Sequence, residues 1–144
     1  MVVLVQHIKS GIRKGFNISG KIVVYTFPFY IFIDWLKYSG FLSVIGDFFK
    51  PITHLMGLPG EATIVLLSGF LINLYPAIAS MVALNLTVKQ ITIIGIVLGI
   101  AHNLIIEGIV LSKSGVKIYI TILFRLFLAI ITGVGVNLIW NFLS

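Results

Sequence analysis

The residues best suited to chemistry lie inside an apolar stretch, residues 91–112. His102, Asn103 and Glu107 stand there among isoleucine, leucine, valine and glycine residues. A charged side chain at the centre of a membrane helix costs about 2.5–3.5 kcal/mol on insertion scales, so it persists where it faces protein, water or a ligand. An amide, an imidazole and a carboxylate could hydrogen-bond a polar solute, and the carboxylate could bind a proton or a cation.

The spacing in this stretch places small and polar residues on one face. Gly95, Gly99, Asn103 and Glu107 follow one another at intervals of four, which forms a single stripe on a helix. One interpretation is a close helix–helix contact through the glycines, with Asn103 hydrogen-bonded across it. The other is the wall of a cavity whose polar half contacts a substrate. The stripe alone leaves both interpretations open.

Arg125 is a candidate partner for Glu107. It lies inside the last apolar stretch, residues 116–143, and the turn at residues 112–115 makes the two stretches antiparallel neighbours. At 1.5 Å per helical residue, Glu107 and Arg125 differ in depth by only roughly 5 Å. We expect them to form an ion pair or to share a polar network. The alternative is that Arg125 extends toward the basic end of its helix and reaches the membrane surface.

Composition excludes a soluble domain. The chain has 144 residues, of which 59% are hydrophobic and 10% charged, whereas about a quarter of the residues in soluble domains are charged. We therefore expect one membrane domain over residues 1–144, multi-pass in the cell membrane and in contact with lipid. The net charge of +6 comes from basic residues that flank apolar segments, which indicates membrane topology and not nucleic-acid binding.

Several function classes lack the residues that they need. The sequence has no cysteine and only three scattered histidines, so disulfides, iron–sulfur ligation and a histidine metal site are not expected. It contains no nucleotide-binding motif, and no carboxylate pair or nucleophile–base set indicates an enzyme. No cofactor is expected beyond a coupling proton or Na⁺.

The sequence divides into six segments around these residues. Residues 2–18 have an amphipathic pattern typical of a helix in the membrane interface, residues 21–38 form a first span, and residues 40–57 are too charged to cross. Residues 88–112 form a broken second span and residues 116–143 a third. Residues 58–85 contain four residues that weaken a helix, Ser68, Gly69, Asn73 and Pro76. Two geometries are therefore open for this segment. One is a kinked spanning helix, which composition alone favours, and the other is a re-entrant hairpin of two half-helices.

The order of these segments resembles one structural repeat of the concentrative nucleoside transporters. The local sequences GLPGEATIVLLSGF, LYPAIASMVALNLT and AHNLIIEG resemble the nucleoside-recognition (Gate) domain family. That family also includes the spore maturation proteins A and B and the two halves of the membrane part of the ferrous iron transporter B. The resemblance covers residues 21–143 and implies an all-α integral membrane protein with interfacial helices, three full transmembrane helices and a re-entrant helical hairpin.

The resemblance also implies a set of ligand-contacting residues. The hairpin tip would run from Ser68-Gly69 to Asn73, with Tyr75 just beyond it, and the unwound part of the broken span would fall at Ala101-His102-Asn103. Where the transporters carry Gly-Gln-Thr-Glu or Gly-Gln-Ser-Glu at the tip, this chain has Gly69-Phe70-Leu71-Ile72, so the tip lacks their carboxylate. The absence of cysteine argues against an iron pathway.

Three crossings would let two copies in opposite orientations imitate an inverted repeat. An antiparallel homodimer, or pairing with a related half-subunit, is therefore expected. The positions of basic residues favour one orientation with the N-terminus inside, and hence a parallel homodimer or a hetero-partner. The N-terminal side would carry Lys9, Arg13, Lys14, Lys21, Lys113 and Lys117, against Lys37, Lys50 and Lys89 on the other.

Two functions remain after this reasoning. The first is a minimal transporter or transporter half-subunit for a small polar solute, with nucleosides among the candidates. In this transporter, the solute site would be lined by Ser68, Gly69, Asn73, Tyr75, His102 and Asn103. Glu107 would be a coupling site or the structural partner of Arg125. The second is a structural or regulatory membrane module without transport, like the spore maturation proteins. A polar cavity beside Asn73 and Asn103 would favour the first function.

Overall fold

The computed structural model describes residues 2–143 and shows seven helices and no strand within them. The side chains at 2–5, 21–22, 25–26, 29–30, 33–34, 36–37 and 42 are not described, so those of Lys21 and Lys37 lie outside the described part. The helices are α1 (Val2–Tyr38), α2 (Phe41–Leu55), α3 (Ala62–Leu71), α4 (Leu74–Ala83), α5 (Val88–Ala101), α6 (Leu104–Ser112) and α7 (Ile118–Leu143).

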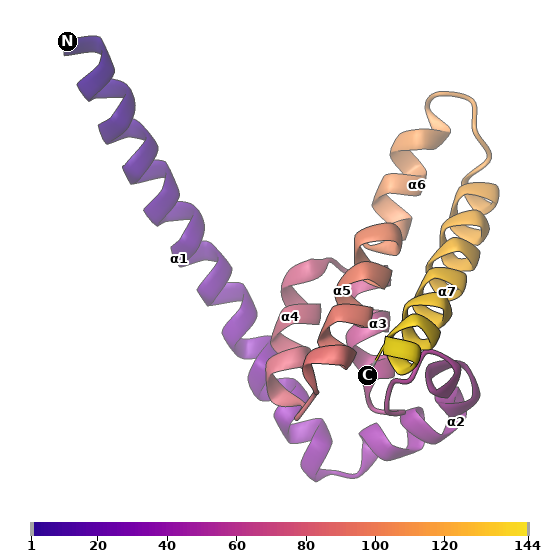
Figure 1. The fold of residues 1–144 in the computed structure, drawn as a ribbon. Helices are drawn as coiled ribbons and strands as arrows, with labels where there is room; N and C mark the ends of the chain where they lie inside the picture. Colours follow the sequence, from indigo (N-terminus) through magenta and orange to yellow (C-terminus); the bar gives the residue numbers. More distant parts are fainter. Residues whose placement is uncertain (1, 144) are drawn as a thin grey trace.

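The helices follow a path between two ends of the molecule (Figure 1). The N-terminus and the turn between α6 and α7 lie at one end, and the C-terminus lies toward the other end. Helix α1 descends to α2, the short helices α3 and α4 run up and back, and α5 with α6 ascends before α7 returns.

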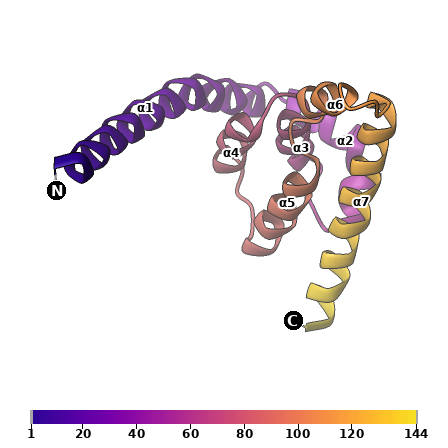
Figure 2. The ribbon, with the colours of Figure 1, turned by 90° about the horizontal axis from the view of Figure 1, so that it is seen from above.

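The first helix is longer than the sequence indicated. The segments 2–18 and 21–38, expected to be separate, form one continuous helix, and Pro28 lies within it without ending it. Only its later part packs on the other helices, and residues 6–20 are all exposed. Seen from above, α1 leads away from the rest of the chain (Figure 2). It ends at Tyr38, and Gly40, whose φ is 76°, turns the chain into α2.

Residues 58–85 form two short antiparallel helices that pack against each other, α3 and α4. The kinked single helix that composition favours is therefore not the arrangement found. The chain reverses at Ile72 and Asn73, where Asn73 has an extended backbone and its Oδ1 accepts a hydrogen bond from the Tyr75 N–H at 2.9 Å. Such a side-chain cap satisfies an N–H group that a helix leaves free at its start, so Asn73 begins α4.

The expected break in the second span lies between α5 and α6. Helix α5 begins with a capping box, in which Thr87 accepts from the Gln90 N–H and the Gln90 side chain accepts from the Thr87 N–H. It ends at Ala101, and α6 begins at Leu104 after Asn103 adopts a left-handed conformation with φ 51°. Asparagine is one of the few residues other than glycine that adopts this conformation readily, which explains why the helix is interrupted here.

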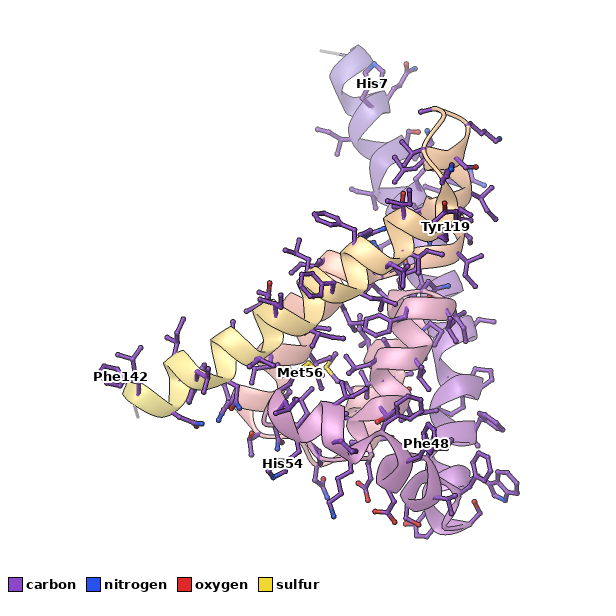
Figure 3. The ribbon with its side chains drawn as sticks, turned by 90° about the vertical axis from the view of Figure 1, so that its right-hand side faces the viewer. His7, Phe48, His54, Met56, Tyr119 and Phe142 are labelled. Carbon is purple, nitrogen blue, oxygen red and sulfur yellow. The ribbon has the colours of Figure 1, made fainter. Side chains whose placement is uncertain are left out.

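Helix α3 occupies the centre of the packing, with α2, α4, α5 and α6 as neighbours, and α7 covers α5 and α6. The core is formed by small and branched apolar side chains of the α2–α3 loop, α3, α4, α5 and α7. Met56, in that loop, is 2% exposed and points inward (Figure 3). At the corner between α2 and α3, a Cβ on Gly60 would lie 2.6 Å from the Gly46 carbonyl oxygen, so this corner requires glycine.

The surface is unusually apolar for a chain in water. Many large apolar side chains of α1, α6 and α7 are exposed, among them Phe16, Phe127 and Phe142, and contiguous exposed apolar surface indicates contact with a membrane or a partner. In the described part of the chain, two stretches are long and apolar enough to cross a bilayer, Val88–Ser112 and Ile118–Leu143. The all-α class and the apolar character of the chain are therefore as expected.

Candidate functional site

Ends of four short helices meet at one place in the fold. The last turn of α3 includes Ser68 and Gly69, and the carbonyl groups of a helix's last turn need donors from outside the helix. The Ser68 carbonyl accepts from the N–H groups of Ile72 and Asn73, and the Gly69 carbonyl accepts from the Asn103 N–H at 2.9 Å. The hairpin tip is thus bonded directly to the interruption between α5 and α6.

Gly69 allows this contact because it has no side chain. A Cβ at this position would lie 2.4 Å from Leu98 Cδ2 and 3.3 Å from the Cβ of Ala77. Leu98 is itself only 2% exposed, so it has little room to move away. Glycine therefore sets how closely α3 approaches α5, and this closeness brings the Gly69 carbonyl to Asn103.

A chain of polar side chains extends from the interruption to α7. His102 Nε2 lies 3.2 Å from Glu107 Oε1, and Arg125 Nη1 donates to Glu107 Oε2. Glu107 lies in the first turn of α6, where unpaired N–H groups and the helix dipole favour a negative charge. The Glu107–Arg125 ion pair inferred from their depths is thus present, and His102 extends it.

Arg125 also caps the broken helix. Its Nε donates to the Ile100 carbonyl oxygen at 2.8 Å. Because α5 ends at Ala101, the carbonyl groups of its last turn lack the donor that a continuous helix would supply four residues later. The guanidinium group therefore supplies hydrogen bonds both to a carbonyl left free by the interruption and to the Glu107 carboxylate. The Arg125 side chain is only 17% exposed. Arg125 does not extend away to the membrane surface.

Asn103 carries an unused hydrogen-bond acceptor at the same place. Its side-chain Oδ1 is buried and has no hydrogen-bond partner in the structure, although the residue as a whole is only partly buried. A buried polar atom without a partner costs about 1–3 kcal/mol. A donor group of a bound molecule would remove this cost.

The other residues inferred from the sequence differ in how accessible they are. Ser68 is buried, and its hydroxyl donates to the carbonyl groups of Ile64 and Val65 in its own helix. Gly69 is buried against Leu98 as well. Asn73, His102 and Asn103 are partly buried and Tyr75 is exposed, so these residues are at least partly accessible, whereas Ser68 and the Oδ1 atom of Asn103 are not.

The glycine stripe on α5 is not a packing contact within the chain. Gly95 and Gly99 are exposed, and among the described residues no atom would lie within 4 Å of a Cβ on either glycine. His102 and Glu107, at the polar end of this segment, have side chains that are 31% and 37% exposed. The stripe therefore lies on an open face, where the described part of the chain forms neither a packed contact nor an enclosed cavity.

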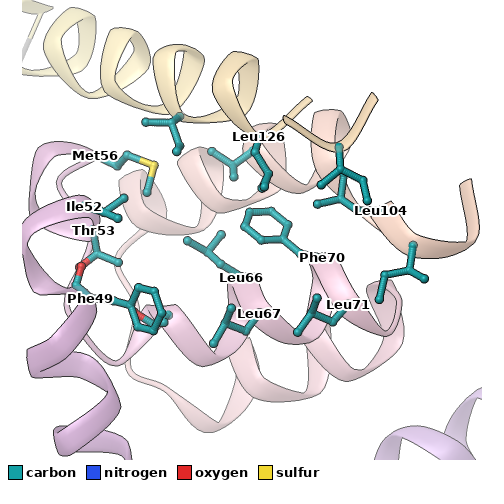
Figure 4. A pocket seen from close by; sticks show the side chains of 15 residues that line it. Phe49, Ile52, Thr53, Met56, Leu66, Leu67, Phe70, Leu71, Leu104 and Leu126 are labelled. Carbon is teal, nitrogen blue, oxygen red and sulfur yellow. The ribbon is translucent and has the colours of Figure 1, made fainter. Parts of the chain in front are cut away.

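A separate cavity lies behind this face. It has a volume of about 320 Å³ and lies between α2, α3, α6 and α7 (Figure 4). Its lining is apolar apart from two threonines, Thr53 and Thr63, and it includes Phe70 and Leu71 of the hairpin. Neither Asn73 nor Asn103 lines it, so this cavity does not provide a site for a polar solute.

Two polar contacts were not anticipated from the sequence. Asn137, in the last helix, is 8% exposed and donates to the Leu55 carbonyl oxygen at 3.1 Å, which ties α7 to the end of α2. Lys89 Nζ donates to Asn141 Oδ1 at 2.6 Å and joins the start of α5 to the end of α7. A buried asparagine in an apolar span was the available signal for the first contact, but its carbonyl partner is remote in the sequence.

Comparison with known proteins identifies the family. A family model described as nucleoside recognition, the Gate domain, matches residues 20–140. The chain is 33% identical over 132 residues to the uncharacterized membrane protein YvoD of Bacillus subtilis. The aligned region covers 92% of this chain and 42% of YvoD. The chain therefore spans about two fifths of this relative, and no solved structure gives a significant match. On the extent of the family match, the chain belongs to the nucleoside-recognition (Gate) family of membrane proteins.

Proposed function

We propose that this protein is half of a membrane transporter for a small polar solute, with nucleosides as the first candidates. The solute would contact Asn73, His102 and Asn103, with Tyr75 at the edge of the site. Transport would proceed by alternating access around the hairpin tip and the broken span. The family assignment supports transport-related activity, and the residues of the site support a polar ligand.

One observation carries this proposal, the hydrogen bond from the Asn103 N–H to the Gly69 carbonyl. It joins two helix interruptions, and irregular backbone at membrane depth is tolerated where it faces protein or water. Discontinuous helices of this kind form the binding sites of many secondary transporters. The unpartnered Oδ1 of Asn103 adds an acceptor for an N–H or O–H group of the solute.

In this proposal the chain crosses the cell membrane three times. The crossings are the later part of α1, the pair α5 and α6, and α7, while α3 and α4 enter and leave from the same side and α2 lies along the surface. The path of the helices in Figure 1 supports this topology. The apolar stretches Val88–Ser112 and Ile118–Leu143 supply two of the three spans.

A second subunit would complete the site. Gly95, Gly99, His102 and Glu107 lie on an open face, which a membrane protein would cover with lipid or protein. Small residues at intervals of four allow close approach of another helix. We propose that a second copy of this chain, or a related half-subunit, packs on this face and encloses the polar residues.

One set of contacts favours the alternative, a structural or regulatory membrane module. His102, Glu107 and Arg125 contact one another and nearby backbone carbonyls. Such a network could stabilise the interruption without any solute. The side-chain oxygen of Asn103 has no partner in the described structure. The transporter needs this oxygen to bind the solute, whereas the structural module does not need it.

Uptake by purified protein in liposomes tests the proposal. Radiolabelled uridine and adenosine would be offered to vesicles with the wild type, with Asn103→Gly and with Asn85→Gly as a control in an exposed loop. Glycine keeps the left-handed backbone at position 103 and removes the side chain with its amide. We expect uptake by the wild type and by Asn85→Gly, and at least a tenfold loss in Asn103→Gly. Equal uptake by empty vesicles and by all three proteins would contradict transport of these nucleosides and favour the structural module.

A further inference from the structure

The imidazole of His102 lies between two hydrogen-bond acceptors. Its Nδ1 is 3.0 Å from the Leu98 carbonyl oxygen, and its Nε2 is 3.2 Å from Glu107 Oε1. The Leu98 carbonyl also accepts the His102 backbone N–H at 2.9 Å, and a carbonyl oxygen has a second lone pair for the ring. Because a carbonyl cannot donate, Nδ1 must carry a proton in this arrangement.

The proton on Nδ1 leaves Nε2 without one in a neutral ring. A neutral imidazole has one N–H, so its other nitrogen is an acceptor, and an ionised carboxylate has only acceptors. Nε2 and Oε1 would then face each other at hydrogen-bonding distance with no proton between them. Both contacts are satisfied only if the pair holds one additional proton.

We propose that His102 and Glu107 together form a proton-binding site, in which one proton lies between Nε2 and Oε1. Arg125 donates to the other carboxylate oxygen of Glu107, so the proton shared with His102 does not compete with the guanidinium for the same atom. The pair binds a proton as imidazolium and carboxylate, or as imidazole and carboxylic acid. Release of the proton leaves two acceptors in contact and favours their separation.

The surroundings of the pair contain few other charges. Arg125 is the charged residue that α7 brings to it, and α3, which packs on α5 and α6, has no titratable side chain between Ala62 and Leu71. The only other charged residue of α5, Lys89, is bonded to Asn141 at the far end of the helix. Protonation therefore changes the charge of a local group formed by His102, Glu107 and Arg125. Because His102 and Glu107 are partly exposed, a proton can reach them from the open face.

This site assigns the coupling ion. A sodium ion needs several oxygen ligands, whereas the two carboxylate oxygens of Glu107 already face Arg125 and His102. Asn103 follows His102 directly, so a solute on the amide and a proton on the imidazole would be bound by adjacent residues. This step rests on the proposed function and predicts that solute movement is coupled to protons, whereas the proton site itself does not depend on transport.

Magnetic resonance of the protein in lipid bilayers tests the proton site. Ring nitrogens labelled with ¹⁵N and side-chain carboxyl carbons labelled with ¹³C report where protons are bound, and His102→Gln assigns the signals. If the pair holds the additional proton, the spectra show either two protonated ring nitrogens on His102 or a protonated Glu107 carboxyl group. A bare Nε2 together with an ionised Glu107 in the wild type would overturn the proposal, and this comparison requires no variant other than the one used for assignment.

Glu107→Gln provides the matched perturbation, and Glu61→Gln is the control because Glu61 is the chain's other glutamate and is exposed. A glutamine amide can turn its N–H₂ group toward Nε2 and satisfy a neutral ring. We therefore expect His102 to show one protonated ring nitrogen in Glu107→Gln, and the wild-type signals in Glu61→Gln. A doubly protonated ring in Glu107→Gln would show that Glu107 does not hold the proton.

The coupling step is tested separately with radiolabelled uridine. An acidic exterior should drive accumulation of uridine in vesicles with the wild type or Glu61→Gln, and the gradient should have no effect with Glu107→Gln. Uptake by the wild type that ignores the gradient would overturn proton coupling and leave transport standing. If no uptake occurs, the proposed function and the coupling fail together, whereas the resonance spectra still decide whether the proton site exists.

Discussion

At the scale of single residues, Glu107 and Arg125 each bond to more than one element. Glu107 contacts His102 and Arg125, and Arg125 contacts Glu107 and the Ile100 carbonyl oxygen. Removal of one member therefore leaves polar groups of the others unpaired, and such groups are expensive to bury. The network fixes the position of the interruption relative to α7.

A double-mutant cycle measures this network. We expect Arg125→Leu to lower the free energy of unfolding by about 1–2 kcal/mol more in the wild type than in the Glu107→Gln background, within the range for residues of one hydrogen-bond network. A smaller loss should remain in the Glu107→Gln background, because the Ile100 carbonyl also loses its donor. Unfolding of the four proteins in mixed detergent micelles provides the measurement. Identical effects of Arg125→Leu in both backgrounds would contradict the ion pair.

The sequence predicted this ion pair because helical rise converts residue number into depth. It did not predict the bond from Arg125 to Ile100, since a backbone carbonyl leaves no mark in the sequence. The accessibility of Ser68 was also beyond sequence reasoning. A serine in an apolar helix can face a ligand or bond to its own helix, and only the packing of α3 shows that it does the latter.

At the scale of helices, the break at Asn103 and the reversal at Asn73 follow from residues that weaken a helix. Their meeting depends on Gly69, which permits close approach of α3 to α5. The sequence left a kinked helix and a hairpin open for residues 58–85, because half-helices of about ten residues and one interrupted helix have the same composition. The continuity of α1 was not predicted either, since an amphipathic pattern that gives way to an apolar one does not require a break between them.

Labelling of introduced cysteines tests the hairpin in a membrane. The chain has no native cysteine, so Ser10→Cys, Glu61→Cys, Asn85→Cys and Ser114→Cys each give a single reactive site. We expect an impermeant thiol reagent to reach Glu61→Cys and Asn85→Cys from one side, because α3 and α4 enter and leave together. Ser10→Cys and Ser114→Cys should react from the opposite side. Reaction of Glu61→Cys and Asn85→Cys from different sides would mean that residues 58–85 cross the membrane.

At the scale of the whole molecule, the open face of α5 determines what the single chain lacks. The polar residues are assembled by this chain but are enclosed by nothing within it. Composition and family membership indicate a membrane protein, but neither specifies the surface that the proposed second subunit would cover. We propose the face of α5 that carries Gly95 and Gly99, because no atom of the described residues lies within 4 Å of a Cβ at either glycine.

Gly99→Leu tests this surface as the site of assembly. A leucine meets no atom of its own chain at this position, so we expect the fold to be retained and the association of subunits to be lost. Gly135→Leu is the matched control, because Gly135 also lies in a helix with open space around its Cα. Molecular mass in mild detergent, from light scattering with chromatography, separates the two variants. Unchanged association in Gly99→Leu would exclude the glycine stripe as the contact.

The positions of the two chain ends have a consequence for gene fusion. The N-terminus and the C-terminus lie toward opposite ends of the stack of helices, so in a bilayer they would emerge on opposite sides. A short linker from the last residue of one copy to the first of another would then give the second copy the reverse orientation, with no added transmembrane segment. In the three-crossing topology proposed above, two copies of this 144-residue segment joined in tandem would take both orientations in a single polypeptide.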